Sequence, residues 1–189
     1  MLYDLVKTLF YIIFKIFFKL KIKGAELLPD KGPFIIACNH FSHLDPPVVA
    51  AAYSYQLNFL AKAELFRNKL FGFIISNLNV FSLDRHTADI KSIRIALEIL
   101  KHKPLVIFPQ GTRGGSFDKV SSGIGFLYKK SKVPIFAAKI EGTNKILPKG
   151  AKLPHLGKIE ISFTKVDNIE EGDNRKEIAS KVMDIIRKL

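Results

Sequence analysis

The alternation of short apolar runs with helical patterns constrains the fold of this chain more than any other feature. The runs have the length and the β-branched content of buried strands. They cover residues 34–38, 57–61, 80–83, 105–108, 135–140 and 159–163. Helical spacing relates Ile90, Ile93, Leu97 and Leu100, and again Ile178, Val182, Ile185 and Leu189. Strands that alternate with helices predict a layered α/β fold around a central mixed, largely parallel sheet.

The size and composition of the chain indicate one globular domain. It has 189 residues, of which 48% are hydrophobic and 25% charged, enough for a real core and too apolar for disorder. We expect residues 24–189 to form this domain and residues 1–23 to form a membrane-anchoring amphipathic helix. The single cysteine, Cys38, excludes a disulfide scaffold and any zinc site built from several cysteines.

The charge of the chain narrows the classes of partner. Lys and Arg number 30 against 17 Asp and Glu, which gives a net charge of +13. A surface this basic attracts nucleic acid, an anionic membrane or phosphorylated substrates. No nucleic-acid-binding motif is present and the basic residues are dispersed, so we expect no nucleic-acid partner.

The N-terminal segment, residues 2–20, is apolar but is interrupted by charges. A spanning helix needs about 20 mostly apolar residues, so this segment is too short and too charged to cross a bilayer. On a helical wheel, a polar arc of roughly 120° contains Asp4, Lys7, Thr8, Lys15 and Lys19, and most of the rest is apolar. Such a helix lies in the membrane interface.

We therefore expect an anionic membrane surface as a partner, with Lys21 and Lys23 beside its headgroups. The expected location is the cytoplasmic face of the cell membrane, with monotopic or peripheral attachment. Two alternatives stay open, a signal peptide and an ordinary core helix. The lysines within the apolar stretch and the missing cleavage site argue against the signal peptide.

A histidine and an aspartate follow the first predicted strand, at positions 40 and 45. Asp45 could accept a hydrogen bond from one imidazole nitrogen of His40, leaving the other nitrogen to take a proton from a substrate hydroxyl. Alternatively, Asp45 merely caps the helix that begins at Pro46. His43 is a competing base, although it is more typical of a surface position.

A glycine-rich loop, residues 109–115, follows the strand at 105–108. Its glycines allow a backbone to approach a ligand closely, and the guanidinium of Arg113 can pair with phosphate oxygens. A plain turn with an exposed arginine is the alternative. Lys62 and Arg85 end two other strands, so several cations could converge where ligands bind in open α/β sheets.

Taken in order, these segments resemble the glycerolipid acyltransferase family, and most closely its bacterial 1-acylglycerol-3-phosphate (lysophosphatidate) acyltransferases. The family's first motif, Asn-His-x4-Asp, is present as Asn39, His40 and Asp45. Asp84 and Arg85 match the end of the second motif, residues 108–113 match the third, and residues 133–135 match the fourth. The similarity covers roughly residues 24–163.

The resemblance implies that His40 is the general base, oriented by Asp45. The free sn-2 hydroxyl of a lysophospholipid would attack the thioester of acyl-CoA or acyl-carrier protein, with no acyl-enzyme, no metal and no other cofactor. Phosphatidate for phospholipid synthesis would be the product. The substrate-binding residues implied by the family are Lys62, Arg85, Gln110, Gly111, Thr112 and Arg113, with the acceptor's phosphate on Arg113 and Lys62.

Three positions depart from the family pattern. Gln110 replaces a glutamate of the third motif, Asn79 stands where the second usually has glycine, and Ala137 where the fourth usually has proline. Because Gln110 removes a carboxylate beside the expected acceptor site, transfer to another lysolipid is an alternative. A non-catalytic basic membrane-binding module is a further one, although the intact His40 and Asp45 pair argues against it.

Overall fold

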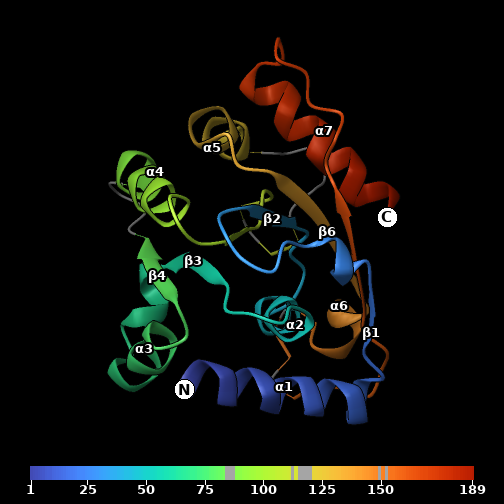
Figure 1. Cartoon of the computed structure of the whole chain (residues 1–189). Helices are drawn as coiled ribbons and strands as arrows, with labels where there is room; N and C mark the ends of the chain where they lie inside the picture. Colours follow the sequence, from blue (N-terminus) through green and yellow to red (C-terminus); the bar gives the residue numbers. More distant parts are fainter. Residues whose placement is uncertain (84–87, 112, 115–120, 149, 152) are drawn as a thin grey trace.

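The computed structural model describes residues 1–83, 88–111, 113–114, 121–148, 150–151 and 153–189. The helices are α1 (Leu2–Phe18), α2 (Asp45–Ala52), α3 (Lys69–Ser76), α4 (Ala88–Ile99), α5 (Gly123–Ser131), α6 (Thr143–Ile146) and α7 (Arg175–Lys188), with short 3-10 turns η1 (Ala25–Leu27) and η2 (Ala63–Phe66) (Figure 1). The strands are β1 (Lys21–Lys23), β2 (Ile35–Cys38), β3 (Asn58–Lys62), β4 (Val80–Leu83), β5 (Leu105–Ile107), β6 (Ile135–Glu141) and β7 (Glu160–Lys165).

Within the described part of the chain, the strands form one sheet in the order β1-β7-β6-β2-β5-β3-β4. The β6–β7 pair is antiparallel, and the other neighbouring pairs are parallel. This confirms the predicted mixed, largely parallel sheet and each of the six predicted strands. Strand β1 was not predicted, because its three residues contain one apolar side chain and give no run to detect.

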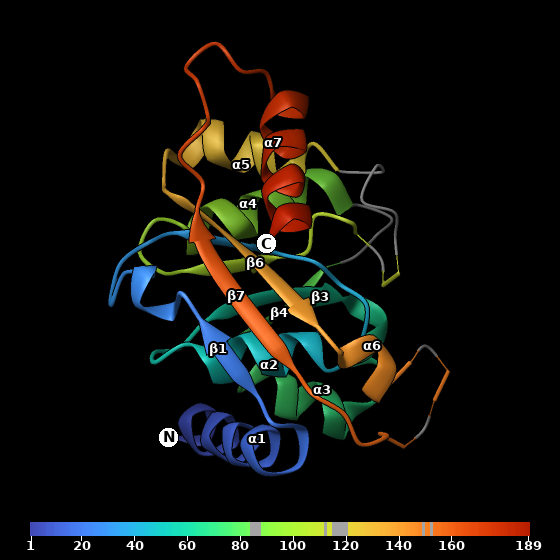
Figure 2. The ribbon, with the colours of Figure 1, turned by 90° about the vertical axis from the view of Figure 1, so that its right-hand side faces the viewer.

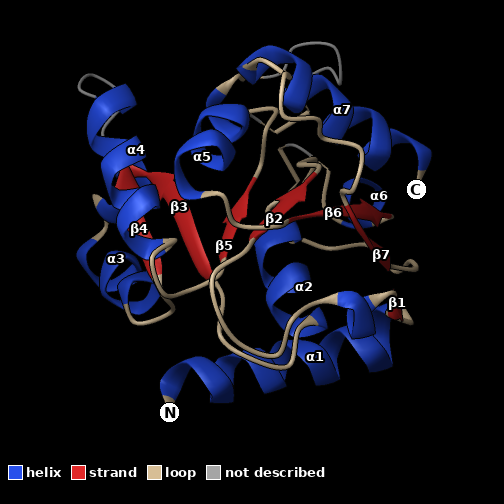
Figure 3. Ribbon diagram, turned by 45° about the horizontal axis from the view of Figure 1, so that its top comes forward, coloured by secondary structure: helices blue, strands red, loops and turns tan. Residues whose placement is uncertain are grey.

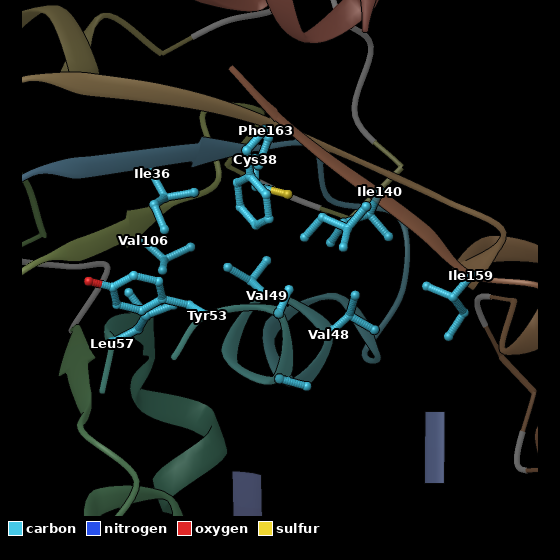
Figure 4. Packing of buried hydrophobic residues seen from close by; sticks show 14 of the residues in the cluster. Ile36, Cys38, Val48, Val49, Tyr53, Leu57, Val106, Ile140, Ile159 and Phe163 are labelled. Carbon is cyan, nitrogen blue, oxygen red and sulfur yellow. The ribbon is translucent and has the colours of Figure 1, made fainter. Parts of the chain in front are cut away.

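Both faces of the sheet are covered, which explains why its strands read as continuous apolar runs. Successive residues of β2 point to opposite faces. Ile36 and Cys38 belong to the cluster covered by α1 and α2, shown in Figure 4. Ile35 and Ala37 belong to the cluster covered by α4, α5 and α7. Figures 2 and 3 show the resulting three layers.

Helix α1 packs against α2 at one end of the molecule (Figure 1). One side of α1 is docked by Tyr3, Phe14 and Phe18, which are buried in the core. Lys7, which the sequence places in the polar arc, donates hydrogen bonds to the Tyr53 and Ser54 carbonyl oxygens just past α2. That lysine therefore holds α1 on the domain instead of facing outward.

The described residues contain no helix with both the length and the hydrophobicity needed to cross a bilayer. The predicted boundary at residue 23 stays a prediction. Strand β1, at residues 21–23, is hydrogen-bonded to β7 and continues the sheet of the main domain.

Candidate active site

The site begins at the carboxyl end of β2, which lies between β6 and β5 in the sheet. The buried side chain of Asn39 donates to the Ile140 carbonyl oxygen at 2.8 Å and accepts from the Ile140 N–H at 2.7 Å. These two bonds tie the start of the loop to β6. The residues that follow therefore leave the sheet in a fixed direction.

The next residues form a histidine–carboxylate pair. The Nδ1 of His40 lies 2.9 Å from Oδ2 of Asp45, and that oxygen also accepts the N–H groups of Phe41 at 2.7 Å and Ser42 at 2.8 Å. An ionised carboxylate can only accept, so Nδ1 carries the imidazole proton and Nε2 keeps a free lone pair. Asp45 is fully buried, whereas the His40 side chain keeps 18% of its surface exposed. The pair is thus arranged for a base that can reach a substrate.

The alternative function of Asp45, capping a helix, does not match its bonds. Asp45 is the first residue of α2, and its oxygens accept from the imidazole and from groups outside that helix. The side chain thus closes the loop between β2 and α2 and fixes the plane of the His40 ring.

Thr143 completes the support of the carboxylate, and the sequence reasoning missed it. Its hydroxyl donates to Oδ1 of Asp45 at 2.6 Å, and both side chains are buried. Thr143 begins α6 directly after β6, so it lies at the same sheet edge as the loop after β2. Its position shortly after a predicted strand is the one signal that could have found it.

Two potential nucleophiles near His40 are unsuited to form an acyl-enzyme. Ser42 is buried and donates its hydroxyl proton to the Leu147 carbonyl oxygen at 2.9 Å. The Cys38 thiol is fully buried; this burial, together with the charge of Asp45, raises its pKa well above the usual value. A protonated, inaccessible thiol is a poor nucleophile. The site therefore suits direct attack by a substrate hydroxyl.

The loop after β5 holds His40 at three points. The ring of Phe108 stacks on the imidazole, with centroids 4.3 Å apart. Oε1 of Gln110 accepts the His40 N–H at 2.6 Å, and the Gly114 N–H donates to the His40 carbonyl oxygen at 2.9 Å. Gln110 is only 7% exposed. This loop is therefore a structural partner of His40 and more than a plain turn.

The predicted substrate-binding residues that the structure describes lie at the edge of the sheet where β2, β3 and β5 end, as His40 does. Arg113 is half-buried. Loss of contact with water, and after it the positive charge of Arg113, lower the pKa of His43. Lys62 is exposed at the end of β3, two strands from β2, which corresponds to about 10 Å. Arg85 and Thr112 lie outside the described residues.

Gly111 gives the loop its shape. Its φ of 67° is in the left-handed region, which other residues rarely adopt. A Cβ built there would meet no atom of the described residues within 4 Å, so they leave space beside this backbone. The open backbone lies in the loop that carries Gln110 and Arg113, where the sequence predicts close approach of a ligand.

Comparison with known proteins decides the family. A model of the acyltransferase family matches residues 19–141, which include β2, the His40 loop and the loop after β5. The chain belongs to this acyltransferase family. The match confirms the family predicted from the four motifs.

Two relatives with the same printed name come from bacteria. A 1-acyl-sn-glycerol-3-phosphate acyltransferase of Bacillus subtilis is 30% identical over 143 residues, which cover 75% of this chain and 70% of that protein. The enzyme of the same name from Streptococcus pneumoniae is 31% identical over 63% of this chain and 46% of its own length. The present chain thus spans about half of the latter protein.

A solved structure has the same fold. The crystal structure of the 1-acyl-sn-glycerophosphate (LPA) acyltransferase PlsC from Thermotoga maritima matches with a TM-score of 0.78. The match covers 98% of this chain and 76% of that chain at 23% identity. At this identity the likeness is one of fold, and it agrees with the predicted α/β class.

The contact between Gln110 and His40 leads to a first prediction for the acyltransferase. Gln110→Ala should lower kcat about tenfold with little change in either KM, because a hydrogen bond that positions His40 is lost. Gln110→Glu should retain most of kcat, since a carboxylate oxygen can accept the same N–H. Steady-state kinetics with each substrate varied would measure this. A large rise in the acceptor KM of Gln110→Ala would instead support the predicted substrate-binding role.

Proposed function

We propose that this acyltransferase transfers a fatty acyl group from acyl-CoA or acyl-carrier protein to the sn-2 hydroxyl of 1-acylglycerol 3-phosphate, forming phosphatidate. The observation that carries the proposal is the His40–Asp45 pair, with Nε2 of His40 available on the side of the sheet where Arg113 lies. The names of the Bacillus and Streptococcus relatives support the choice of acceptor.

In the proposed reaction, His40 moves one proton. Its Nε2 takes the proton of the acceptor hydroxyl while the hydroxyl oxygen attacks the thioester carbonyl carbon. The tetrahedral intermediate collapses, the carbon–sulfur bond breaks, and the leaving sulfur receives the proton from His40. Asp45 stays ionised throughout and stabilises the imidazolium, aided by its bonds from Thr143, Phe41 and Ser42.

The acceptor's phosphate is assigned to Arg113, with Lys62 as a second cation. Arg113 lies one residue before Gly114, whose N–H bonds the His40 carbonyl oxygen, so the guanidinium and the base belong to one connected unit. A guanidinium pairs with phosphate oxygens through two parallel bonds, which fixes orientation as well as affinity. Such a clamp would direct the free hydroxyl toward His40.

Membrane attachment through α1 is the second part of the proposal. A row of exposed apolar residues, here called the apolar stripe, consists of Leu2, Leu5, Leu9, Ile12 and Ile16. The stripe follows the helical period on the side of α1 opposite Tyr3, Phe14 and Phe18. Soluble monomers rarely expose a contiguous apolar surface of this kind. Both sides of α1 are thus apolar, one docked on the protein and one free for lipid.

Other exposed apolar side chains support attachment at the same end of the molecule. They are Leu65 of η2, Leu70, Phe73 and Ile74 of α3, and Leu153 and Leu156 between α6 and β7. Figures 1 and 2 show α1 and α3 at this end, and the segment between α6 and β7 also reaches it in Figure 2. A bilayer there would lie close to the substrates, because acceptor and product are lipids.

The phosphate assignment is tested by changing Arg113. Arg113→Ala should raise the KM for lysophosphatidate by about 10- to 150-fold, the value of one charge-assisted hydrogen bond of roughly 1.5–3 kcal/mol. Turnover of a monoacylglycerol, which lacks the phosphate, should hardly change, and Arg113→Lys should recover part of the loss. An effect confined to the KM of the thioester donor would move Arg113 to the donor side.

A further inference from the structure

A second concentration of positive charge lies where α1, α6 and the start of β1 come together (Figure 1). There the surface forms an open cavity of about 460 Å³. We name it the cationic cavity; its charged lining consists of Lys19, Lys21, Lys145, Lys158, Glu141 and Glu160. None of these residues takes part in the His40 site.

The positive charge of the cationic cavity is not neutralised by its own acids. Glu160 is paired with Lys23 and also interacts, at longer range, with the charge of Lys21. A carboxylate oxygen of Glu141 lies 3.9 Å from Nζ of Lys139, and neither Lys23 nor Lys139 lines the cavity. Among the described residues, no carboxylate lies within salt-bridge distance of the four lining lysines. Four ammonium groups around one concave surface suit an anion, since each is a compact point charge with three donors.

The cationic cavity lies at the edge of the sheet where β2 ends and the His40 loop begins, here called the catalytic edge. Lys21 lies opposite Glu160 on β1 and β7, and Glu160 lies opposite Glu141 at the end of β6. Strand β6 runs parallel to β2, so the cavity is at the sheet edge from which His40 emerges.

Gly142 allows two backbone segments that line the cationic cavity to approach each other closely. Gly142 has φ of 91°, and a Cβ there would lie 1.9 Å from the Lys158 carbonyl oxygen. The close approach of these two backbones brings the segments that carry Lys145 and Lys158 together. The next residue, Thr143, holds Asp45.

We propose that the cationic cavity binds the phosphate-bearing headgroup of an anionic phospholipid in the bilayer. Lys19 is the C-cap of α1 and directly follows the helix that carries the apolar stripe. With the stripe at the boundary of the acyl chains, the end of α1 lies at headgroup level, where basic residues attract anionic lipid. The inference rests on the membrane attachment proposed above and adds a defined lipid site to it.

The bound headgroup would hold the catalytic edge of the sheet against the membrane. The stripe alone lets α1 lie on any lipid surface, whereas a charged cavity beside α6 favours anionic membranes. Attachment at both points would also limit rotation about the axis of α1.

The test compares two pairs of substitutions in the full chain. Lys145→Gln with Lys158→Gln removes two charges from the cationic cavity. Lys15→Gln with Lys69→Gln removes two exposed charges from α1 and α3, at the same end of the molecule but outside the cavity. Flotation would measure binding to vesicles of phosphatidylcholine, with and without one third phosphatidylglycerol. Turnover of dispersed short-chain lysophosphatidate would serve as the check on folding.

The cavity pair should lose about 30-fold of the preference for anionic over neutral vesicles, because both lost ammonium groups would contact the same bound headgroup, at about 1 kcal/mol each. The control pair should lose less than about fivefold, and neutral-vesicle binding should stay unchanged in both. An equal loss of this preference in the two pairs would overturn the proposed lipid site, because it would indicate diffuse electrostatic attraction between the protein and the membrane. Failure to bind neutral vesicles in the unmodified protein would instead contradict attachment by the apolar stripe.

Two further outcomes would assign the cationic cavity to another anion. Inorganic phosphate that raises the Tm of the unmodified protein but not of the cavity pair, while vesicle preference is equal in both, would indicate a site for free phosphate. A raised KM for acyl-carrier protein in the cavity pair, with vesicle preference intact, would indicate a docking site for the acidic donor. Either result would overturn the lipid-headgroup assignment.

Discussion

Replacing His40 by alanine should lower kcat by roughly 10²–10⁴-fold, the range that a general base contributes. The expected loss follows from geometry: Nδ1 is committed to Asp45, so Nε2 is the free basic atom at the end of β2. Acyl transfer from a thioester to lysophosphatidate, followed as thiol release, would measure it. The KM values should change little, because the imidazole is assigned to proton transfer.

The neighbouring histidine provides the matched control. His43 is exposed, three residues from His40 in the same loop, and His43→Ala should keep most of the activity. Asp45→Asn should be severely impaired, since an amide can hold the wrong imidazole tautomer. If His40→Ala kept more than about a tenth of the rate with an unchanged Tm, His40 would not be the base.

Polar substitution of the apolar stripe should release the protein from membranes at any salt concentration. The change is Leu5→Ser, Leu9→Ser and Ile12→Ser together. Each fully buried side chain of this type contributes about 1.5–3 kcal/mol, so even partial burial in lipid predicts at least a 100-fold weaker partition. Flotation with neutral and anionic liposomes would measure the loss. The Tm should stay close to that of the unmodified chain, because these three side chains are exposed.

The control for the stripe is Leu27→Ser, which changes an exposed leucine of η1 outside α1. It should leave membrane binding intact. The unmodified protein should resist extraction by high salt, because burial of apolar surface is not screened over the Debye length of about 8–10 Å. Release of the unmodified protein by salt alone would show that lysines, and not the stripe, hold it on the membrane.

Surface substitution is a cleaner test than deletion of α1. Phe14 and Phe18 are buried in the core, and the Tyr3 hydroxyl accepts a hydrogen bond from the N–H of Leu57, just before β3. Removing residues 1–19 would delete the stripe and would also expose the core that these side chains cover. The resulting loss of activity could then come from instability as well as from release.

Local patterns in the sequence were enough to predict the strands and the contact between His40 and Asp45. The central strands β2, β5 and β6 are mostly buried apolar runs, the pattern expected where both faces of a sheet are covered. His40 and Asp45 are five residues apart in one loop, so their contact depends on local geometry. Strand β1 was not predicted, because an edge strand of three residues is stabilised by its pairing with β7 and not by its own composition.

Contacts between distant segments could not be predicted in the same way. Thr143 is 98 residues from Asp45, and Gln110 is 70 residues from His40. Which strand ends are neighbours depends on the order of the sheet, and sequence order does not determine it. For the same reason the family motif suggested substrate binding for Gln110, whereas the structure adds a bond to the backbone of the base.

The two apolar sides of α1 show a further limit of prediction from the sequence. A helical wheel detects the wide apolar surface, but burial against protein and exposure to lipid favour the same residue types. The structure separates them, because Phe14 lies in the core and Leu5 on the surface. The docking of Lys7 on α2 also removes one lysine from the polar arc.

The most direct test of the account is the fate of labelled 1-acylglycerol 3-phosphate incubated with the purified protein and an acyl thioester. We expect labelled phosphatidate in an amount equal to the thiol released, with both lost in His40→Ala. Lysolipids with other headgroups should react more slowly at equal concentration. Thiol release without labelled phosphatidate, or product formation that persists in His40→Ala, would contradict His40-dependent transfer to lysophosphatidate.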